Sequence, residues 1–270
     1  MLSELWLTDG GAPYKGSALF PLIEQEAWML WSRDKNVATL HFWRHRQALL
    51  LGSRDASLPD SQSAIEALSE NGYAVAVRAF GGLAVALDEG VLNVTLILPG
   101  APALDDAFAF MAGLLHDALA PFVDIRVGEI AGSYCPGRYD MSVAGYKIIG
   151  IAQRRIAGVI AVSAFVNVQG SSRLREEAVM TYYATACPSS LRDEGRWSPP
   201  DVWLGSTASM NDLMGEAGFT VTQCKKAIVS AAAQRTGMPI HLAPALQDDY
   251  RRQAEIRLRR GRYAIDWWKA

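Results

Sequence analysis

The sequence predicts an α+β (mixed α/β) domain in which helices flank one central, mostly antiparallel sheet. Strand-like runs rich in Val and Leu gather in the middle of the chain, and helix-like segments lie at both ends. The chain has 270 residues, of which 50% are hydrophobic and 20% charged, so it can bury a substantial core. We expect a catalytic domain at residues 1–205 and a helical C-terminal extension at 206–270 packed on it.

The first half of the chain alternates between helix-like and strand-like segments. A helix is predicted at 18–31, a strand at 47–51 and a second helix at 62–71, which Asp60 and Ser61 can cap and Gly72 can end. Three closely spaced strand-like runs follow, separated by glycines, at 74–79, 83–87 and 93–98. Because so few residues connect these runs, we expect them to be hairpin neighbours.

In the second half, a helix precedes a further group of strands. Residues 103–119 place apolar side chains at helical spacing, which predicts a helix over one face of the sheet. Strands are predicted at 124–130, 139–144, 147–156 and 159–168, with tight turns at 145–146 and 157–158. From residue 171 onward helices dominate, with a loop near 196–204.

Charge and targeting patterns limit the partners. The formal charge is −2, so no overall field attracts nucleic acid or an anionic membrane. A local arginine cluster near the C-terminus is typical of a solvated helix face balanced by neighbouring acids; it contains Arg251, Arg252, Arg257, Arg259, Arg260 and Arg262. The chain shows no signal-peptide pattern, and its most apolar run, 159–168, is far shorter than the about 20 residues that span a bilayer. We expect a soluble cytoplasmic protein.

The three cysteines differ in their surroundings. Their odd number and the lack of a CxxC pair argue against a disulfide framework and against a cysteine metal site. Cys224 shares an apolar helical face, which predicts buried packing, and Cys187 has no motif around it. Cys135 lies in a predicted loop, where a substrate can reach its thiol. We therefore expect Cys135 to be the nucleophile.

Two further segments carry chemistry-bearing residues. Gly81 and Gly82 lie between two strand-like runs, which by itself indicates no more than a turn. Lys147 lies in a strand otherwise filled by isoleucines. Since burying an unpaired ammonium is unfavourable, Lys147 is predicted to point to a site, or alternatively to reach solvent along its aliphatic stem.

These segments resemble the superfamily of lipoate-protein ligases, biotin-protein ligases and octanoyltransferases. The match in the first segment runs through Arg78, Gly81, Gly82, Ala84, Val85, Asp88, Gly90, Leu92 and Asn93. It departs from the ligase pattern at Leu83, where a third glycine usually lies, and at Leu87, where many members have His. These departures make an ATP-using ligase less favoured.

The second segment contains a GxKIxGxAxxR setting, reproduced by Gly145, Lys147, Ile148, Gly150, Ala152 and Arg155. By resemblance, Lys147 contacts the acyl carbonyl or the activated intermediate. The string SYCPGRYDMS resembles the loop of the octanoyltransferase branch that takes octanoyl groups from the glycine-cleavage H protein, in which the loop cysteine is the nucleophile.

The resemblance implies the transfer of an octanoyl group through a thioester on Cys135. The donor would be octanoylated H protein, and the acceptor would be the lipoyl-domain lysine of 2-oxoacid dehydrogenase E2 subunits. No cofactor and no metal are expected. Lys147 as a nearby cation would favour the thiolate and the developing oxyanion. Substrate binding is expected of Arg78, Gly81, Gly82, Asp88, Asn93, Gly145 and Gly150. No histidine is an obvious general base, since His41, His45, His116 and His241 all lie away from the motifs.

Three alternatives stay open from the sequence. An ATP-dependent lipoate or octanoate ligase would use Lys147 on an acyl-adenylate, and a related transferase would draw octanoyl groups from acyl carrier protein. A catalytically silent acyl- or lipoyl-domain-binding protein is the third. Four arginines could bind an acidic carrier domain, or alternatively form ordinary ion pairs at the surface; they are Arg78, Arg138, Arg154 and Arg155.

Overall fold

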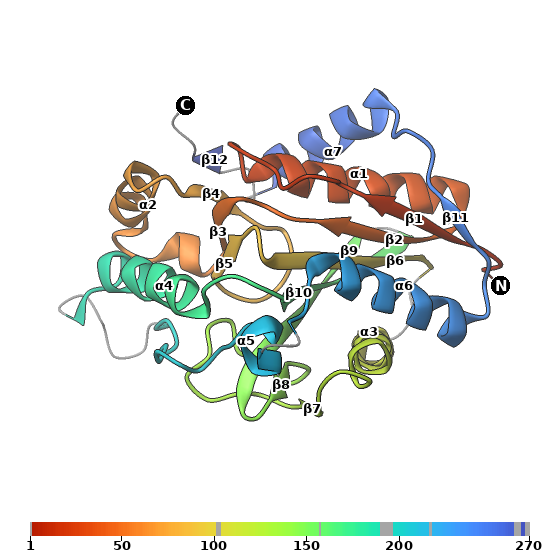
Figure 1. Cartoon of the computed structure of the whole chain (residues 1–270). Coiled ribbons are helices and arrows are strands. Elements are labelled where there is room, and N and C mark those ends of the chain that lie inside the picture. The colour runs from red at the N-terminus through yellow and green to blue at the C-terminus, as the bar shows by residue number, and fades with distance from the viewer. Residues whose placement is uncertain are drawn as a thin grey trace.

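The computed structural model describes residues 2–100, 104–156, 158–189, 197–215, 218–261 and 266–267. The start of the helix predicted at 103, the turn residue 157, the beginning of the loop at 196 and Arg262 lie outside the described residues. Two sheets and the helices around them form the molecule (Figure 1).

The larger sheet has eight strands in the order β11-β1-β2-β6-β10-β9-β8-β7. Strands β11, β1 and β2 are parallel to one another, and every other neighbouring pair is antiparallel. The predicted mixed, mostly antiparallel fold is thereby confirmed. The strands are β1 (Leu5–Asp9), β2 (Ala38–Trp43), β6 (Val91–Pro99), β7 (Ile125–Val127), β8 (Met141–Val143), β9 (Tyr146–Ile156), β10 (Val159–Asn167) and β11 (Ile240–Leu242).

Helices cover both faces of this sheet. In Figure 1, α1 (Leu19–Lys35) lies on one face with α7 (Asp248–Arg260) outside it, while α3 (Leu104–Leu119) and α6 (Val221–Thr236) lie on the other. Strand β10 shows the consequence: Val159 and Ala161 belong to the core on the α1 side, and Ile160 and Val162 to the core on the α3 and α6 side. A strand buried on both faces reads as one continuous apolar run, which explains the composition of residues 159–168.

The smaller sheet has the order β12-β4-β3-β5, with strands β3 (Gln47–Leu51), β4 (Ala74–Val77), β5 (Val85–Asp88) and β12 (Asp266–Trp267). The prediction that the runs at 74–79, 83–87 and 93–98 are hairpin neighbours is wrong. Strand β3 lies between β4 and β5 and pairs with both, and β6 belongs to the larger sheet. The chain between β4 and β5 is thus free to form a loop across the end of β3.

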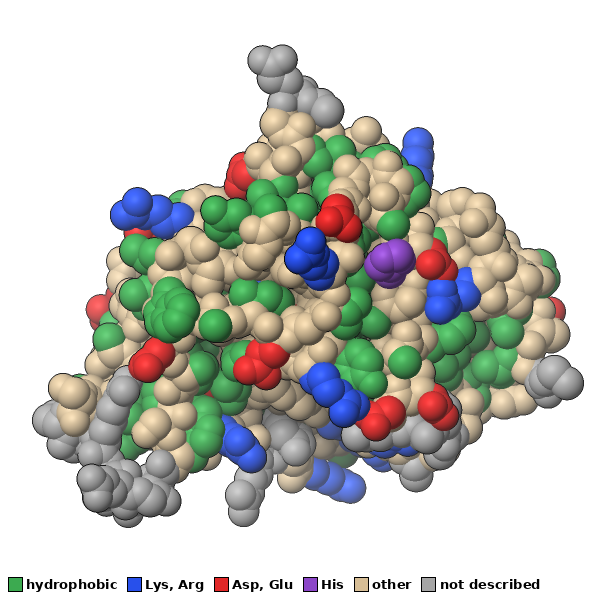
Figure 2. Space-filling model, turned by 90° about the horizontal axis from the view of Figure 1, so that it is seen from below, with side chains coloured by type: hydrophobic (Ala, Val, Ile, Leu, Met, Phe, Trp, Pro, Cys, Tyr) green, Lys and Arg blue, Asp and Glu red, His purple; other side chains and the backbone are tan. Residues whose placement is uncertain are grey.

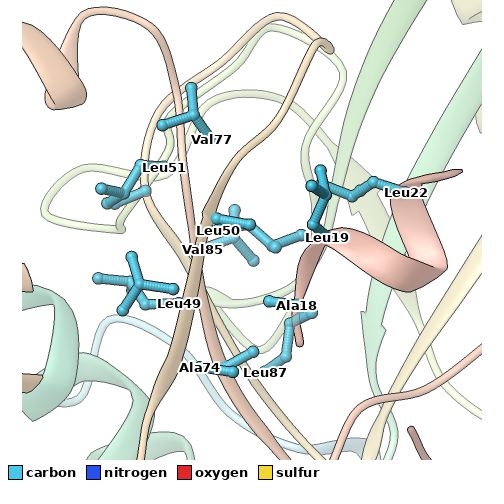
Figure 3. Packing of buried hydrophobic residues seen from close by; sticks show 14 of the residues in the cluster. Ala18, Leu19, Leu22, Leu49, Leu50, Leu51, Ala74, Val77, Val85 and Leu87 are labelled. Atoms are coloured by element: carbon cyan, nitrogen blue, oxygen red, sulfur yellow. The ribbon is translucent and has the colours of Figure 1, made fainter. Parts of the chain in front are cut away.

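The smaller sheet packs between α1 on one side and α2 (Ser61–Glu70) with α4 (Ser172–Ala186) on the other (Figure 1). Side chains alternate along β3: Figure 3 shows Leu50 pointing toward Leu19 and Leu22 of α1, and Leu49 and Leu51 pointing to the opposite side. This α1 side of the smaller sheet becomes one wall of the pocket described below.

The C-terminal part of the chain holds α5 (Met210–Met214), α6 and α7, and it also supplies β11 to the larger sheet and β12 to the smaller one. Helix α7 is joined to α1 by ion pairs from Arg251 to Glu24 and from Arg257 to Glu26. Arginines of the C-terminal cluster therefore bind acids of α1 as well as acids of their own helix. Among the described residues, no helix is both long and apolar enough to cross a membrane.

Candidate active site

Cys135 lies in the loop between β7 and β8, half-buried, with a backbone φ of +48°. Its sulfur accepts two hydrogen bonds, from the backbone N–H of Leu83 at 3.1 Å and from Nη2 of Arg78 at 3.2 Å. A non-glycine residue in the left-handed region is held there only when its surroundings fix it. The two donors come from the loop between β4 and β5, so the thiol bridges two segments that are distant in sequence.

The loop between β4 and β5 is shaped by Gly82. Its φ is +94°, and a Cβ at this position would lie 2.7 Å from Nη2 of Arg78 and 2.8 Å from Sγ of Cys135. Only glycine lets the loop, the guanidinium and the thiol approach this closely. Nη2 of Arg78 also donates to the carbonyl of Leu83 at 2.6 Å. Gly81 has open space where a Cβ would be, and its N–H donates to the carbonyl of Gln153.

Lys147 is fully buried on β9 and contacts the backbone of the cysteine loop. Its ammonium donates to the carbonyls of Tyr134 at 2.9 Å and of Cys135 at 2.7 Å, and it lies 2.6 Å from Oδ2 of Asp140. These partners match the three donors of an ammonium group. The sequence predicted Lys147 as a cation beside the thiol; the structure places it on the cysteine's carbonyl instead.

Asp140 is the counter-ion of Lys147, and Oδ2 of Asp140 also accepts from the N–H of Gly137 at 2.9 Å. Burial raises the pKa of Asp140 to about 6, although the positive charge of Lys147 acts in the opposite direction. The pair is almost completely removed from solvent. A buried, hydrogen-bonded pair of this kind fixes geometry, because breaking it leaves one charge without compensation.

A pocket opens beside the thiol, between α1, the smaller sheet and the middle of the larger sheet. The empty space within it is about 460 Å³, a figure that includes the open mouth. Its wall is mostly apolar and includes Leu22 of α1 and, on the smaller sheet, Leu50 and Val85, whose packing region is seen in Figure 3. Two amide groups interrupt this wall, those of Gln25 and Asn93; the Gln25 oxygen accepts from the Trp43 indole at 3.1 Å. The remaining lining residues are Trp43, Arg78, Phe80, Cys135, Gly150, Ile151, Ala152, Ser163 and Phe165.

Of the residues predicted from the sequence, Cys135, Arg78, Asn93 and Gly150 line this pocket, and Gly82 touches the thiol. A Cβ on Gly150 would lie 2.4 Å from the Phe165 ring, so glycine is required for the packing of the pocket wall. The sequence motif and the spatial site therefore overlap at these positions.

Asp88 and Gly145 lie elsewhere in the fold. Asp88 pairs with Arg175 at 2.5 Å and accepts from the N–H of Gly90 at 2.8 Å, which ties the β5–β6 turn to α4. Gly145, with φ +87°, follows Ala144 at +50° in the β8–β9 turn. Two consecutive positive φ values are typical of a tight type I′ hairpin. Asp88 therefore links the β5–β6 turn to α4, and Gly145 allows the tight β8–β9 turn.

The sequence analysis missed three contributors to the site: the Leu83 N–H, Asp140 and Asp55. Asp55 lies in the short 3₁₀ helix η1 (Asp55–Ser57), accepts from the Tyr183 hydroxyl and from the Gly52 N–H, both at 2.8 Å, and supports the loop that carries Gly82. Burial raises the pKa of Asp55 to about 6. Asp140 stands inside the recognised string SYCPGRYDMS, whereas no local pattern marks Asp55.

The other cysteines are buried. Cys187 ends α4, and Cys224 lies in the core on the α6 side, where burial raises the pKa of its thiol to about 12. Arg154 binds Glu26 of α1 at 2.6 Å, as an ordinary ion pair would, while Arg138 is exposed and pairs with Asp105. Arg155 is exposed on β9.

A reachable thiol that accepts two hydrogen bonds at the mouth of an apolar pocket is suited to covalent chemistry on a ligand with an apolar part. Comparison with known proteins gives the family. The model of the lipoyl protein ligase A/B catalytic domain matches residues 19–233, and the chain belongs to this family.

Relatives agree with this assignment. An octanoyl-[GcvH]:protein N-octanoyltransferase from Oceanobacillus iheyensis is 37% identical over 204 residues, covering 73% of this chain and 71% of the relative. A lipoyl-[GcvH]:protein N-lipoyltransferase from Listeria monocytogenes is 38% identical, covering 66% and 64%. The crystal structure of a lipoate-protein ligase A bound with ATP shares the fold, with a TM-score of 0.71 at 18% identity and coverage of 99% of this chain and 98% of that chain.

Proposed function

We propose that the protein transfers an octanoyl group from the octanoylated H protein of the glycine cleavage system to the lipoyl-domain lysine of 2-oxoacid dehydrogenase E2 subunits. The observation that carries the proposal is the Cys135 thiol, hydrogen-bonded by Arg78 and Leu83 at the mouth of an apolar pocket. The relative from Oceanobacillus iheyensis, which bears the matching name, supports the choice of donor.

The reaction consists of two acyl transfers. In the first, the Cys135 thiolate forms an S–C bond to the octanoyl carbonyl carbon, the amide C–N bond of the donor lysine breaks, and the departing nitrogen takes up the equivalent of the proton that the thiol lost. In the second, the acceptor lysine amine attacks the thioester, loses a proton, and releases the thiolate. One amide is exchanged for another, so the donor's own bond supplies the activation and ATP is not consumed.

The pocket suits the apolar tail of the substrate. Burying an eight-carbon chain gains about 0.8 kcal/mol per methylene, with about 5 kcal/mol as a ceiling. The Leu83 N–H donates to the sulfur at 3.1 Å, and in the proposed reaction it can donate instead to the oxygen of an acyl group bonded to that sulfur as negative charge develops. We assign Lys147 and Asp140 to holding the cysteine loop in this arrangement, and we place the reaction in the cytoplasm, where a reduced thiol persists.

The test is intact-protein mass spectrometry after mixing with octanoylated H protein. We expect a single octanoyl adduct that peptide mapping assigns to Cys135 and that hydroxylamine removes. Cys135→Ser should give no hydroxylamine-labile adduct, whereas Cys187→Ser, which removes a buried thiol, should behave as the unmodified protein. An adduct on Cys187, or none on any cysteine, contradicts the proposal.

A donor comparison separates the alternatives. Octanoylated H protein, octanoyl-acyl carrier protein and free octanoate with ATP are offered in turn, with a lipoyl domain as acceptor. We expect transfer from H protein at the highest rate, and none from free octanoate with ATP. Lipoylated H protein belongs in the same series, because the Listeria monocytogenes relative is named as a lipoyltransferase. Full activity of Cys135→Ala with octanoate and ATP would instead identify a ligase.

A further inference from the structure

The two cations nearest to Cys135 differ in how their charge is balanced. Lys147 has a carboxylate partner, Asp140, at 2.6 Å. Arg78 is 8% exposed, and within the described part of the chain it forms no ion pair with a carboxylate. The carboxylate of Asp55 acts on Arg78 only at longer range and is hydrogen-bonded to Tyr183 and Gly52. Among the residues that the structure describes, Arg78 is therefore a buried cation without a contacting counter-ion.

A buried guanidinium without an anion is unfavourable, and the hydrogen-bond acceptors that the described residues offer to Arg78 are neutral unless the thiol ionises. Nη2 of Arg78 contacts the carbonyl of Leu83 and Sγ of Cys135, and Nε has no hydrogen-bond partner in the described residues. Of these contacts, Cys135 is the one that can take a negative charge. A thiolate there would receive a charge-assisted bond from Arg78 and a second bond from the Leu83 N–H.

We infer that Arg78 is a catalytic residue that stabilises the Cys135 thiolate, and that the Lys147–Asp140 pair is a positioning unit acting through the cysteine backbone. The inference rests on the proposed function, in which Cys135 is the nucleophile. Lys147 bonds the carbonyl of Cys135 at 2.7 Å and holds its backbone at a φ of +48°, which aims the sulfur at Arg78 and Leu83. The sequence resemblance, by contrast, had placed Arg78 among substrate-binding residues.

The guanidinium of Arg78 and the N–H of Leu83 can also act in the next step, the attack of the sulfur on the acyl carbonyl. When the sulfur attacks, its negative charge moves to the carbonyl oxygen, which is attached to the carbon that the sulfur has joined. The guanidinium and the Leu83 N–H already face this point, so they need little rearrangement to follow the charge. Arg78 would thus act before and during the formation of the acyl-enzyme.

The test measures the thiol directly, without any acyl donor. Iodoacetamide alkylation of Cys135 is followed by peptide mass spectrometry in the full-length protein and in Arg78→Gln, Arg78→Lys and Arg173→Gln. We expect Arg78→Gln to be slower by about tenfold or more, because a charge-assisted hydrogen bond is lost. Arg78→Lys, which keeps a cation, should be several-fold faster than Arg78→Gln. Arg173 is 74% exposed on α4 and pairs with Glu177, so its variant is the matched control.

The native protein provides a second measurement that does not depend on the folding of the Arg78 variants. The ultraviolet absorbance of a thiolate at neutral pH should be present in it and absent from Cys135→Ser. Missing thiolate absorbance, unchanged alkylation in Arg78→Gln, or equal rates in Arg78→Gln and Arg78→Lys would each overturn the inference. If alkylation follows the expected order but no octanoyl adduct forms, the proposed function fails while the thiolate assignment stands.

Discussion

The ion pair of Lys147 and Asp140 is buried, which costs desolvation energy, and it also holds the backbone of the cysteine loop. The side chains are 0% and 2% exposed, and both are also hydrogen-bonded to the backbone of the cysteine loop. Such a pair contributes little net stability compared with apolar residues, but the loss of one partner is costly. The pair fixes the carbonyl of Cys135, and under the proposed function this positioning, more than any gain in stability, is its role.

We expect Lys147→Met to lower the free energy of unfolding by about 3–5 kcal/mol at neutral pH, because Asp140 is left buried and unpaired. Without Lys147, which lowers the pKa of Asp140, that pKa rises above its value of about 6 in the unmodified protein, so the loss should already shrink as the pH falls toward 6 and the carboxyl becomes neutral. Urea unfolding above and below this pH measures the effect. The control is Lys147→Met combined with Asp140→Leu, which should lose less stability than the two single changes added together. Strict additivity would show that the pair is not coupled.

The loop between β4 and β5 brings two functional groups to the thiol, and it depends on one glycine. Strand β3 separates β4 from β5, so the loop crosses the end of the smaller sheet and meets the cysteine loop coming from the larger sheet. Gly82 lies at this meeting point. Its neighbour Gly81 is exposed and has open space around its missing side chain.

Gly82→Ala should therefore be damaging in two ways. Its Cβ would lie under 3.0 Å from both Arg78 and Cys135, and its φ of +94° is unfavourable for alanine. We expect a stability loss of about 1–3 kcal/mol and a loss of acyl transfer of about tenfold or more, which corresponds to about 1.4 kcal/mol in the barrier. Thermal unfolding and single-turnover acylation measure the two effects. Gly81→Ala is the control for stability, where we expect a change within about 0.5 kcal/mol; equal losses in both variants would contradict the role given to Gly82.

At the scale of the whole molecule, α1 and the helices on the opposite face close both sides of the larger sheet and bury ionisable groups within it. His41 on β2 is 2% exposed, and neither of its ring nitrogens has a hydrogen-bond partner in the part of the chain that the structure describes. Burial lowers the pKa of His41 to about 3. On the face shown in Figure 2, by contrast, acidic and basic side chains are interspersed.

His41 should make the fold sensitive to acid. In the unfolded chain His41 takes up a proton below its ordinary pKa of 6.5, whereas the folded state resists this until about pH 3. Its contribution to stability is thus present above pH 6.5 and falls by up to about 1.4 kcal/mol per pH unit below it. The raised pKa values of Asp55 and Asp140, both about 6, act in the opposite direction between 3.8 and 6.

His41→Leu isolates this contribution from those of the two aspartates. The variant loses no hydrogen bond of the imidazole nitrogens, so we expect it to retain more of its stability on acidification than the unmodified protein. Chemical unfolding at a series of pH values between 6.5 and 4 measures the difference. Parallel pH dependences for the two proteins would show that His41 does not titrate as described.

The sequence by itself predicted most of the local elements and singled out Cys135 as the candidate nucleophile. Helix α3 follows from the helical spacing of its apolar residues, α2 from its capping residues, and the strands from β6 to β10 from short apolar runs bounded by turn residues. Strands β1, β2, β11 and β12 were missed. Loop context set Cys135 apart from Cys187 and Cys224, which the structure buries.

Only the tertiary structure decided how these pieces meet. The placement of β3 between β4 and β5 depends on strand pairing, which periodicity does not encode. The contact from Arg78 to Cys135 joins residues 57 positions apart, and Lys147 reaches the cysteine's carbonyl, not its sulfur. Motif spacing identifies which side chains belong to a site, but the direction of each donor is set by the packing of the whole chain. For that reason the sequence predicted the residues of the site, and the structure assigned their contacts.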